Sequence, residues 1–157
     1  MNSQRLTRIL GVLLAWLCTA QASAWGAEEK PLVCEGTLDK VKHRMSVTVS
    51  NERIEKFQLF SVEPKRGHDC SVEASRDQSK DQWVTSIWDD MPDGTSVVTV
   101  FDRGEMLGTV SLKKNKGKIE IHLGEPRQAG GYCGLNGMIA RTLILTQGQK
   151  KCTLKWD

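Results

Sequence analysis

The residues with the clearest chemical potential lie in a glycine-rich stretch, residues 130–137, which reads Gly-Gly-Tyr-Cys-Gly-Leu-Asn-Gly. A cysteine beside an aromatic residue, with histidines elsewhere in the chain, is the composition of a thiol hydrolase. Such a nucleophile needs a lowered pKa, which a helix N-terminus can supply. No helix is predicted near Cys133, and His122 lies on a predicted strand, facing away from its apolar side. The pattern therefore argues against catalysis by Cys133.

Other residues that can bind a metal or cofactor do not form a recognisable set. The turn at residues 89–94, Asp-Asp-Met-Pro-Asp-Gly, lacks the ligand spacing and the terminal glutamate of a calcium loop. The histidines His43, His68 and His122 are scattered, which is typical of surface residues. The sequence predicts no metal site, no cofactor and no enzyme activity.

The first 24 residues have the pattern of a secretory signal peptide. Arg5 and Arg8 precede an apolar run over residues 9–18, and Ala-Ser-Ala follows at residues 22–24. The run is about half of the ~20 residues that a transmembrane helix needs, so we expect no stable membrane insertion. Cleavage is predicted after Ala24, with Ala27 as the alternative. This leaves a single domain, residues 25–157, that is periplasmic or secreted.

The charge of the exported domain is close to neutral. The whole chain has 22 Lys and Arg against 19 Asp and Glu, a net charge of +3, and removal of Arg5 and Arg8 lowers it to +1. A nucleic-acid binder usually carries a large basic excess, so no nucleic-acid partner is expected.

The cysteine count indicates a disulfide-bonded domain. Cys18 leaves with the signal peptide, and an even number of cysteines in a small exported domain predicts two disulfides. No two of these cysteines have close zinc-ligand spacing. Three connectivities are open, of which the sequential one is slightly favoured and the pairing of first with last is the alternative. The four cysteines are Cys34, Cys70, Cys133 and Cys152.

From residue 32 onward the apolar residues follow a period of two, which is typical of half-buried strands. A turn centred on Glu52 pairs Met45 with Leu59 and Val47 with Phe57, so that one face is apolar. Residues 71–81 are polar and are expected to form a loop or a short helix. The tryptophans Trp83, Trp88 and Trp156 are candidates for the core.

A second block of alternating residues begins at residue 83. A turn between Arg103 and Gly104 pairs Val97 with Val110 and Phe101 with Met106. The next turn, between residues 115 and 116, pairs Val110 with Ile121. Residues 138–145 and 151–156 are predicted to form a last hairpin across Gln147-Gly148. We therefore expect an all-β fold, a small antiparallel barrel or sandwich of about eight strands stapled by two disulfides.

The glycine-rich stretch has two interpretations. In the first it is a structural crossing, where glycines allow close approach of two backbone segments. In the second it is a rigid loop, held by Cys133, that inserts Tyr132, Leu135 and Asn136 into the cleft of a partner. A loop held by a disulfide loses little entropy on binding, which favours such a role.

The chain resembles the bacterial inhibitors of c-type lysozyme, which are small exported β proteins. The likeness lies in the early Cys34 and in Gly130-Gly131-Tyr132 followed by an apolar strand. The family carries a Ser-Gly-x-x-Tyr motif and a Lys-Gly motif that enter the lysozyme cleft. Here the serine is absent and no Lys-Gly motif follows; Arg141 is the nearest basic residue. The resemblance implies a partner-binding set of Gly131, Tyr132, Leu135, Asn136 and Arg141.

The expected function is that of an inhibitor or immunity protein. It would block a cell-wall hydrolase, such as a lysozyme or an amidase, by loop insertion, and its partner would be a secreted or periplasmic protein. The alternative is a non-catalytic structural or assembly subunit of a bacterial envelope complex.

Overall fold

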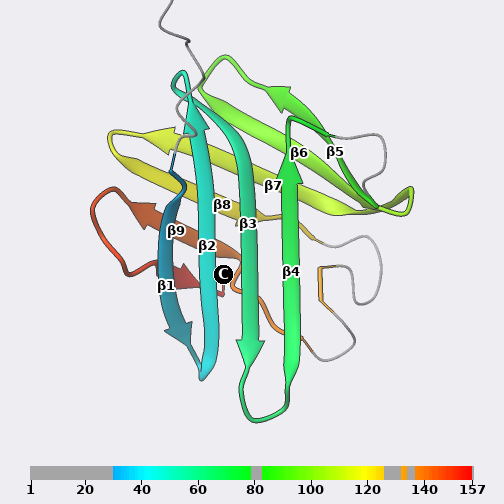
Figure 1. Cartoon of the computed structure of the whole chain (residues 1–157), viewed down its shortest axis with the longest axis vertical. Helices are drawn as coiled ribbons and strands as arrows, with labels where there is room; N and C mark the ends of the chain where they lie inside the picture. The colour runs from blue at the N-terminus through cyan, green and yellow to red at the C-terminus, as the bar shows by residue number, and fades with distance from the viewer. Residues whose placement is uncertain (1–29, 79–82, 126–131, 134–136, 157) are drawn as a thin grey trace, which may run out of the picture.

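Ten β-strands and no helix are formed by the residues that the computed structural model describes, which are 30–78, 83–125, 132–133 and 137–156. The strands form an antiparallel sandwich, not a closed barrel, with a four-stranded sheet in the order β1-β2-β3-β4 and a six-stranded sheet in the order β10-β9-β8-β7-β6-β5. The strands of the first sheet cross those of the second (Figure 1). The bounds are β1 Leu32–Leu38, β2 Val41–Ser50, β3 Arg53–Glu63, β4 His68–Ser75, β5 Val84–Asp90, β6 Thr95–Asp102, β7 Glu105–Asn115, β8 Lys118–Leu123, β9 Thr142–Thr146 and β10 Thr153–Lys155. Of the described residues, none lies in a helix long and apolar enough to cross a membrane.

The all-β prediction is confirmed, and tight turns explain how the strands connect. Four hairpins close through two-residue turns in which both central residues have positive φ, the geometry that suits the twist of antiparallel strands. These turns are Asp39-Lys40, Asn51-Glu52, Arg103-Gly104 and Lys116-Gly117.

The predicted register of the β2–β3 hairpin is confirmed. Met45 pairs with Leu59 and Val47 with Phe57, and all four side chains are fully buried between the sheets. A bulge beyond Thr48 shifts the pairing next to the turn without moving these residues off the core face.

The predicted pairing in the second sheet is correct at one end of β6 and wrong at the other. Phe101 pairs with Met106 as predicted, but a bulge after Val100 brings Val98, not Val97, opposite Val110. The extra residue is Leu107 on β7, because Val100 pairs with Gly108 and Phe101 with Met106, and beyond it the pairing is shifted by one residue. Val98 and Val100 are therefore buried, whereas the predicted Val97 lies half-buried on the outer face.

The β7–β8 register differs from the prediction by two residues. Val110 pairs with Leu123, not Ile121, because the turn lies at Lys116-Gly117. A shift of two keeps each side chain on its own face, so Ile119 and Ile121 are still buried as expected.

Two segments form different elements from those predicted. Residues 71–75, expected in a loop or helix, are part of β4, where Val72 and Ala74 point into the core between polar neighbours. The last hairpin is shorter than predicted, since β9 begins only at Thr142 and β10 is limited to Thr153–Lys155.

The three tryptophans have different environments. Trp88 packs edge-on against Phe57, with ring centroids 6.0 Å apart, and the half-buried Trp156 lies against the core. The prediction of a core position is wrong for Trp83, which is 69% exposed beside Arg103.

Candidate functional site: a structural crossing and an anchored cationic loop

Tyr132 is a buried crossing residue, not a presented contact. Its side chain is 7% exposed, and its hydroxyl donates to the Thr109 carbonyl oxygen on β7 at 2.8 Å. A Cβ at Gly108 would lie 2.2 Å from that hydroxyl, so the ring can cross β7 only because this position is glycine. Burial raises the pKa of Tyr132 to about 12, which keeps the hydroxyl protonated as a donor. The partner-contact prediction for Tyr132 is therefore wrong.

The disulfides connect Cys34 to Cys152 and Cys70 to Cys133. Two disulfides were predicted, but the favoured sequential pairing is wrong and the alternative is present. Cys34 lies on β1 and Cys70 on β4, the opposite edges of the first sheet, so neither can reach the other. Each is bonded instead to the segment that covers its own edge. As a disulfide, Cys133 has no free thiol to act as a nucleophile.

The other predicted contact residues are not brought together as an exposed set. Arg141 is engaged by an ion pair to Glu125, with Nη1 2.5 Å from Oε1, which raises the pKa of the guanidinium and lowers that of the carboxyl. This pair joins the chain after β8 to the chain before β9. Gly131, Leu135 and Asn136 lie outside the described residues.

His43 is a buried structural histidine, contrary to the expectation of a surface position. Its Nε2 accepts the Ala140 backbone N–H at 2.9 Å, so the ring proton is on Nδ1, which donates to the Val41 carbonyl at 3.1 Å. Burial lowers the pKa of His43 and favours the neutral ring. Alternate side chains on β2 point into the core, and His43 lies between the inward-pointing Val41 and Met45 in this alternation. The alternation in the sequence could therefore have placed His43 in the core.

Asp90, at the end of β5 where the acidic turn begins, forms ion pairs with two arginines. Arg76 approaches Asp90 to 2.5 Å and stacks over the Trp88 ring at 4.3 Å, and Arg53 lies 3.5 Å from the same carboxylate. The Arg76 hydrogen bond, aided by Ser96, lowers the pKa of Asp90. Within the described ranges, no three His, Cys, Asp or Glu side chains gather as metal ligands.

Sequence reasoning did not single out the exposed loop between β9 and β10. Residues 147–151, called the anchored loop below, are all exposed. At its start the Gln147 N–H donates to the Gly117 oxygen at 2.7 Å. At its end the Lys150 oxygen accepts from the Glu35 N–H at 2.9 Å, and the Glu35 oxygen accepts from the Cys152 N–H at 3.0 Å. The disulfide from Cys152 to β1 follows at once.

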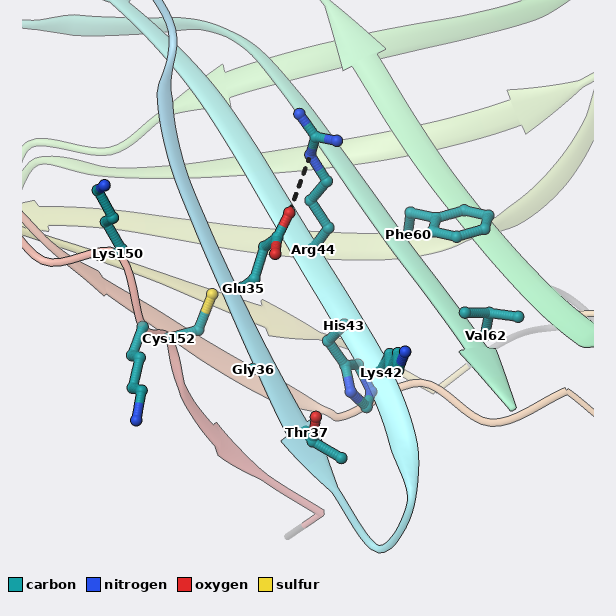
Figure 2. Close-up of a pocket in the computed structure, with 11 residues that line it drawn as sticks. Glu35, Gly36, Thr37, Lys42, His43, Arg44, Phe60, Val62, Lys150 and Cys152 are labelled. Carbon is teal, nitrogen blue, oxygen red and sulfur yellow. Dashed lines mark ion pairs between the residues drawn. The ribbon is translucent and has the colours of Figure 1, made fainter. Parts of the chain in front are cut away.

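A groove of about 830 Å³ lies on the outer face of β1, β2 and β3 beside the anchored loop. Figure 2 shows Lys150 at one side of this face and Phe60 and Val62 at the other, with Glu35 and Arg44 between them. This cationic groove is lined chiefly by Glu35, Lys42, Arg44, Phe60, Val62 and Lys150.

The candidate site therefore consists of the anchored loop and the cationic groove. Its sequence signal is the adjacent pair Lys150-Lys151, and nothing local in the sequence indicates that this turn lies beside Glu35. Comparison with protein-family models, with curated proteins and with solved structures finds no match to this chain.

Proposed function

We propose that this protein is a non-catalytic binding protein that blocks a cell-wall hydrolase in the periplasm. The two disulfides indicate an oxidising, extracellular-type environment, which the periplasm provides. The signal-peptide pattern of the first 24 residues adds to this assignment.

The observation that carries the proposal is the anchored loop, which takes the place of the glycine-rich stretch as the contact surface. It is exposed, and backbone hydrogen bonds and a disulfide hold its two ends. A loop already held in one conformation loses little entropy when it binds. This is the property that loop insertion requires.

The charge of the anchored loop indicates the type of cleft. Lys150 and Lys151 are adjacent, exposed cations at its end. Glycoside hydrolases such as lysozymes place a pair of carboxylates at the reacting bond, so their clefts are locally acidic. Opposite charges across an interface increase the association rate and suppress wrong partners.

The test is an inhibition assay with the oxidised protein, a c-type lysozyme and a peptidoglycan amidase, followed by the turbidity of cell-wall suspensions. We expect inhibition of at least one enzyme at micromolar protein. The K150E/K151E double variant should inhibit roughly tenfold less, because two favourable charges become repulsive.

The matched control is K65E/R66E, which reverses two adjacent exposed cations on the β3–β4 turn. It should inhibit like the unmodified protein. Absence of inhibition of both enzymes, or equal losses for the two double variants, would refute the proposal.

A second candidate function is that of an assembly subunit of an envelope complex. Exposed apolar residues near β5 favour this candidate. This strand is an edge of the six-stranded sheet, and Ile87 on it is 57% exposed, as is Trp83 at 69%, just before the strand begins. Edge strands with apolar side chains pair readily with other chains. Cross-linking from position 87 to an abundant envelope protein would favour this candidate over inhibition.

A further inference from the structure

The cationic groove combines a positive charge with an apolar floor. Its lining includes four cations, Lys42, Arg44, Lys150 and Lys151, and one carboxylate, Glu35, a net charge of +3. The predicted exported chain carries only +1 in total, so the rest of its surface is net negative. The excess of positive over negative charge therefore lies at this face, and the rest of the predicted domain has a net charge of −2.

These cations are available to a ligand. Among the described residues, no carboxylate forms an ion pair with Lys42, Lys150 or Lys151. Arg44 lies 3.9 Å from Glu35, but both side chains are more than half exposed, and such pairs contribute little stability. An anionic ligand can therefore engage them without breaking a strong internal contact.

The strand register arranges the groove in two rows. Arg44 on β2 pairs with Phe60 on β3, and Lys42 pairs with Val62, so each cation lies beside an apolar side chain. Residues two apart on a strand are about 7 Å from one another on the same face. An extended peptide repeats its own side chains at the same interval. Carboxylates at positions i and i+2 of such a peptide match Lys42 and Arg44.

The apolar floor distinguishes between classes of anionic ligand. Phe60 is 39% exposed within the groove, and Val62 is half-buried beside it. A sulfated or carboxylated polysaccharide would use the cations and leave this apolar surface uncovered. A peptide with alternating acidic and apolar side chains would use both when its acidic side lies over the β2 row and its apolar side over the β3 row, because successive side chains of an extended chain point to opposite sides.

The wall of the groove is held in place before any ligand arrives. The Cys34–Cys152 disulfide and the two backbone hydrogen bonds of Glu35 hold the segment that carries Lys150 and Lys151 against β1. A Cβ at Gly36 would lie 3.2 Å from the Cys152 carbonyl oxygen and 2.9 Å from a side-chain carbon of Leu154, so the glycine leaves room for this close approach.

We propose that the cationic groove binds an extended, acidic segment of a protein partner that carries carboxylates at i and i+2 with apolar side chains between them. This inference rests on the proposed function, since it assigns the part of the partner that lies beside the anchored loop. The anchored loop enters the cleft of the partner, and the cationic groove binds a second segment of the same partner.

The experiment is an NMR titration of isotope-labelled, oxidised protein with the capped hexapeptide Glu-Leu-Glu-Val-Glu-Leu. We expect saturable shifts at the amides of Lys42, Arg44, Phe60 and Val62. The K42E/R44E variant should bind roughly tenfold more weakly, and F60S should also bind more weakly. The control K65E/R66E should bind like the unmodified protein, and circular dichroism checks that every variant is folded.

Three further probes separate the possible ligands: the matching peptide with lysine in place of glutamate, dextran sulfate and sodium phosphate. The lysine peptide should not bind, and the other two should bind without dependence on Phe60. The inference is overturned if the acidic peptide gives no saturable shifts, if K42E/R44E binds it normally, or if only dextran sulfate binds. Peptide binding without hydrolase inhibition would refute the proposed function alone, and inhibition without peptide binding would refute the groove alone.

Discussion

At the scale of single residues, the protonation state of His43 affects how the β8–β9 connection packs against β2. A backbone N–H can only donate, so the bond from Ala140 requires a lone pair on Nε2. The Trp156 ring lies edge-on at 6.0 Å, and burial excludes the water that would solvate a charged imidazole. Protonation of Nε2 would place its N–H directly against the N–H of Ala140. Two donors cannot hydrogen-bond to each other, so the segment before β9 would be released.

This contact predicts an acid-sensitive stability. The pKa of His43 is lowered in the folded state, whereas the unfolded chain takes up a proton near pH 6.5. The free energy of unfolding is therefore at its full value above pH 6.5 and falls as the pH decreases toward the lowered pKa, by at most about 1.4 kcal/mol per pH unit. Urea unfolding between pH 5 and 7 measures this slope.

Two histidine variants test this assignment, H43Q as the test variant and H68Q as its control. H43Q should be less stable at pH 7 and should lose the slope between pH 5 and 6.5. The aspartates and glutamates with lowered pKa values, Asp90 among them, titrate at lower pH and do not interfere. H68Q, at the start of β4, should keep the slope. An unchanged slope in H43Q would contradict the role given to this ring.

At the scale of elements, the connection between β8 and β9 is held across the sandwich by one aromatic residue and one glycine. Tyr132 lies across β7, and its hydroxyl satisfies the Thr109 carbonyl. The adjacent Cys133 is bonded to β4. The connection is thus fastened to both sheets within two residues.

A double-mutant cycle tests this crossing. G108A should cost about 2 kcal/mol of stability, because the new methyl group overlaps the Tyr132 hydroxyl at 2.2 Å and the ring must move. Y132F should cost about 1 kcal/mol through the lost hydrogen bond. Together they should cost less than the sum, since removing the hydroxyl relieves the closest overlap. Strict additivity in urea unfolding would contradict the crossing.

At the scale of the whole molecule, the two disulfides join segments distant in the sequence. Cys34–Cys152 spans 118 residues and joins the first strand to the start of the last. Cys70–Cys133 spans 63 residues and joins the other edge of the first sheet to the β8–β9 connection. The sandwich is thereby closed covalently at both open sides.

Removing either bond should therefore destabilise the domain strongly. C34A/C152A should lower the free energy of unfolding by roughly 4 to 5 kcal/mol, mainly through the entropy of the unfolded chain. C70A/C133A should cost about 0.5 kcal/mol less, because its loop is shorter. Urea unfolding without reductant measures both. Non-reducing peptide mapping checks the connectivity, and a Cys34–Cys70 peptide would contradict this structure.

Local pattern was sufficient for most of the strands and for the number of disulfides, but not for the end of β4 or the bounds of the last hairpin. The alternation of Met45 and Val47 against Phe57 and Leu59 determines which face of the first hairpin is buried, because neighbouring side chains on a strand point to opposite sides. The even cysteine count after the predicted signal peptide predicted two disulfides, and the structure contains two.

Tertiary structure decided the features that depend on residues distant in the sequence. The bulge at Leu107 shifts the β6–β7 pairing by one residue, so only the paired strands reveal that Val98, not Val97, lies opposite Val110. The cysteine partners depend on which strands form the edges of the sheets, and Tyr132 is buried because Gly108 on another strand leaves room for its ring. Lys150 borders a groove because Glu35, more than a hundred positions earlier, holds its backbone. Each of these outcomes is set by long-range contacts, which no local pattern of residue types encodes.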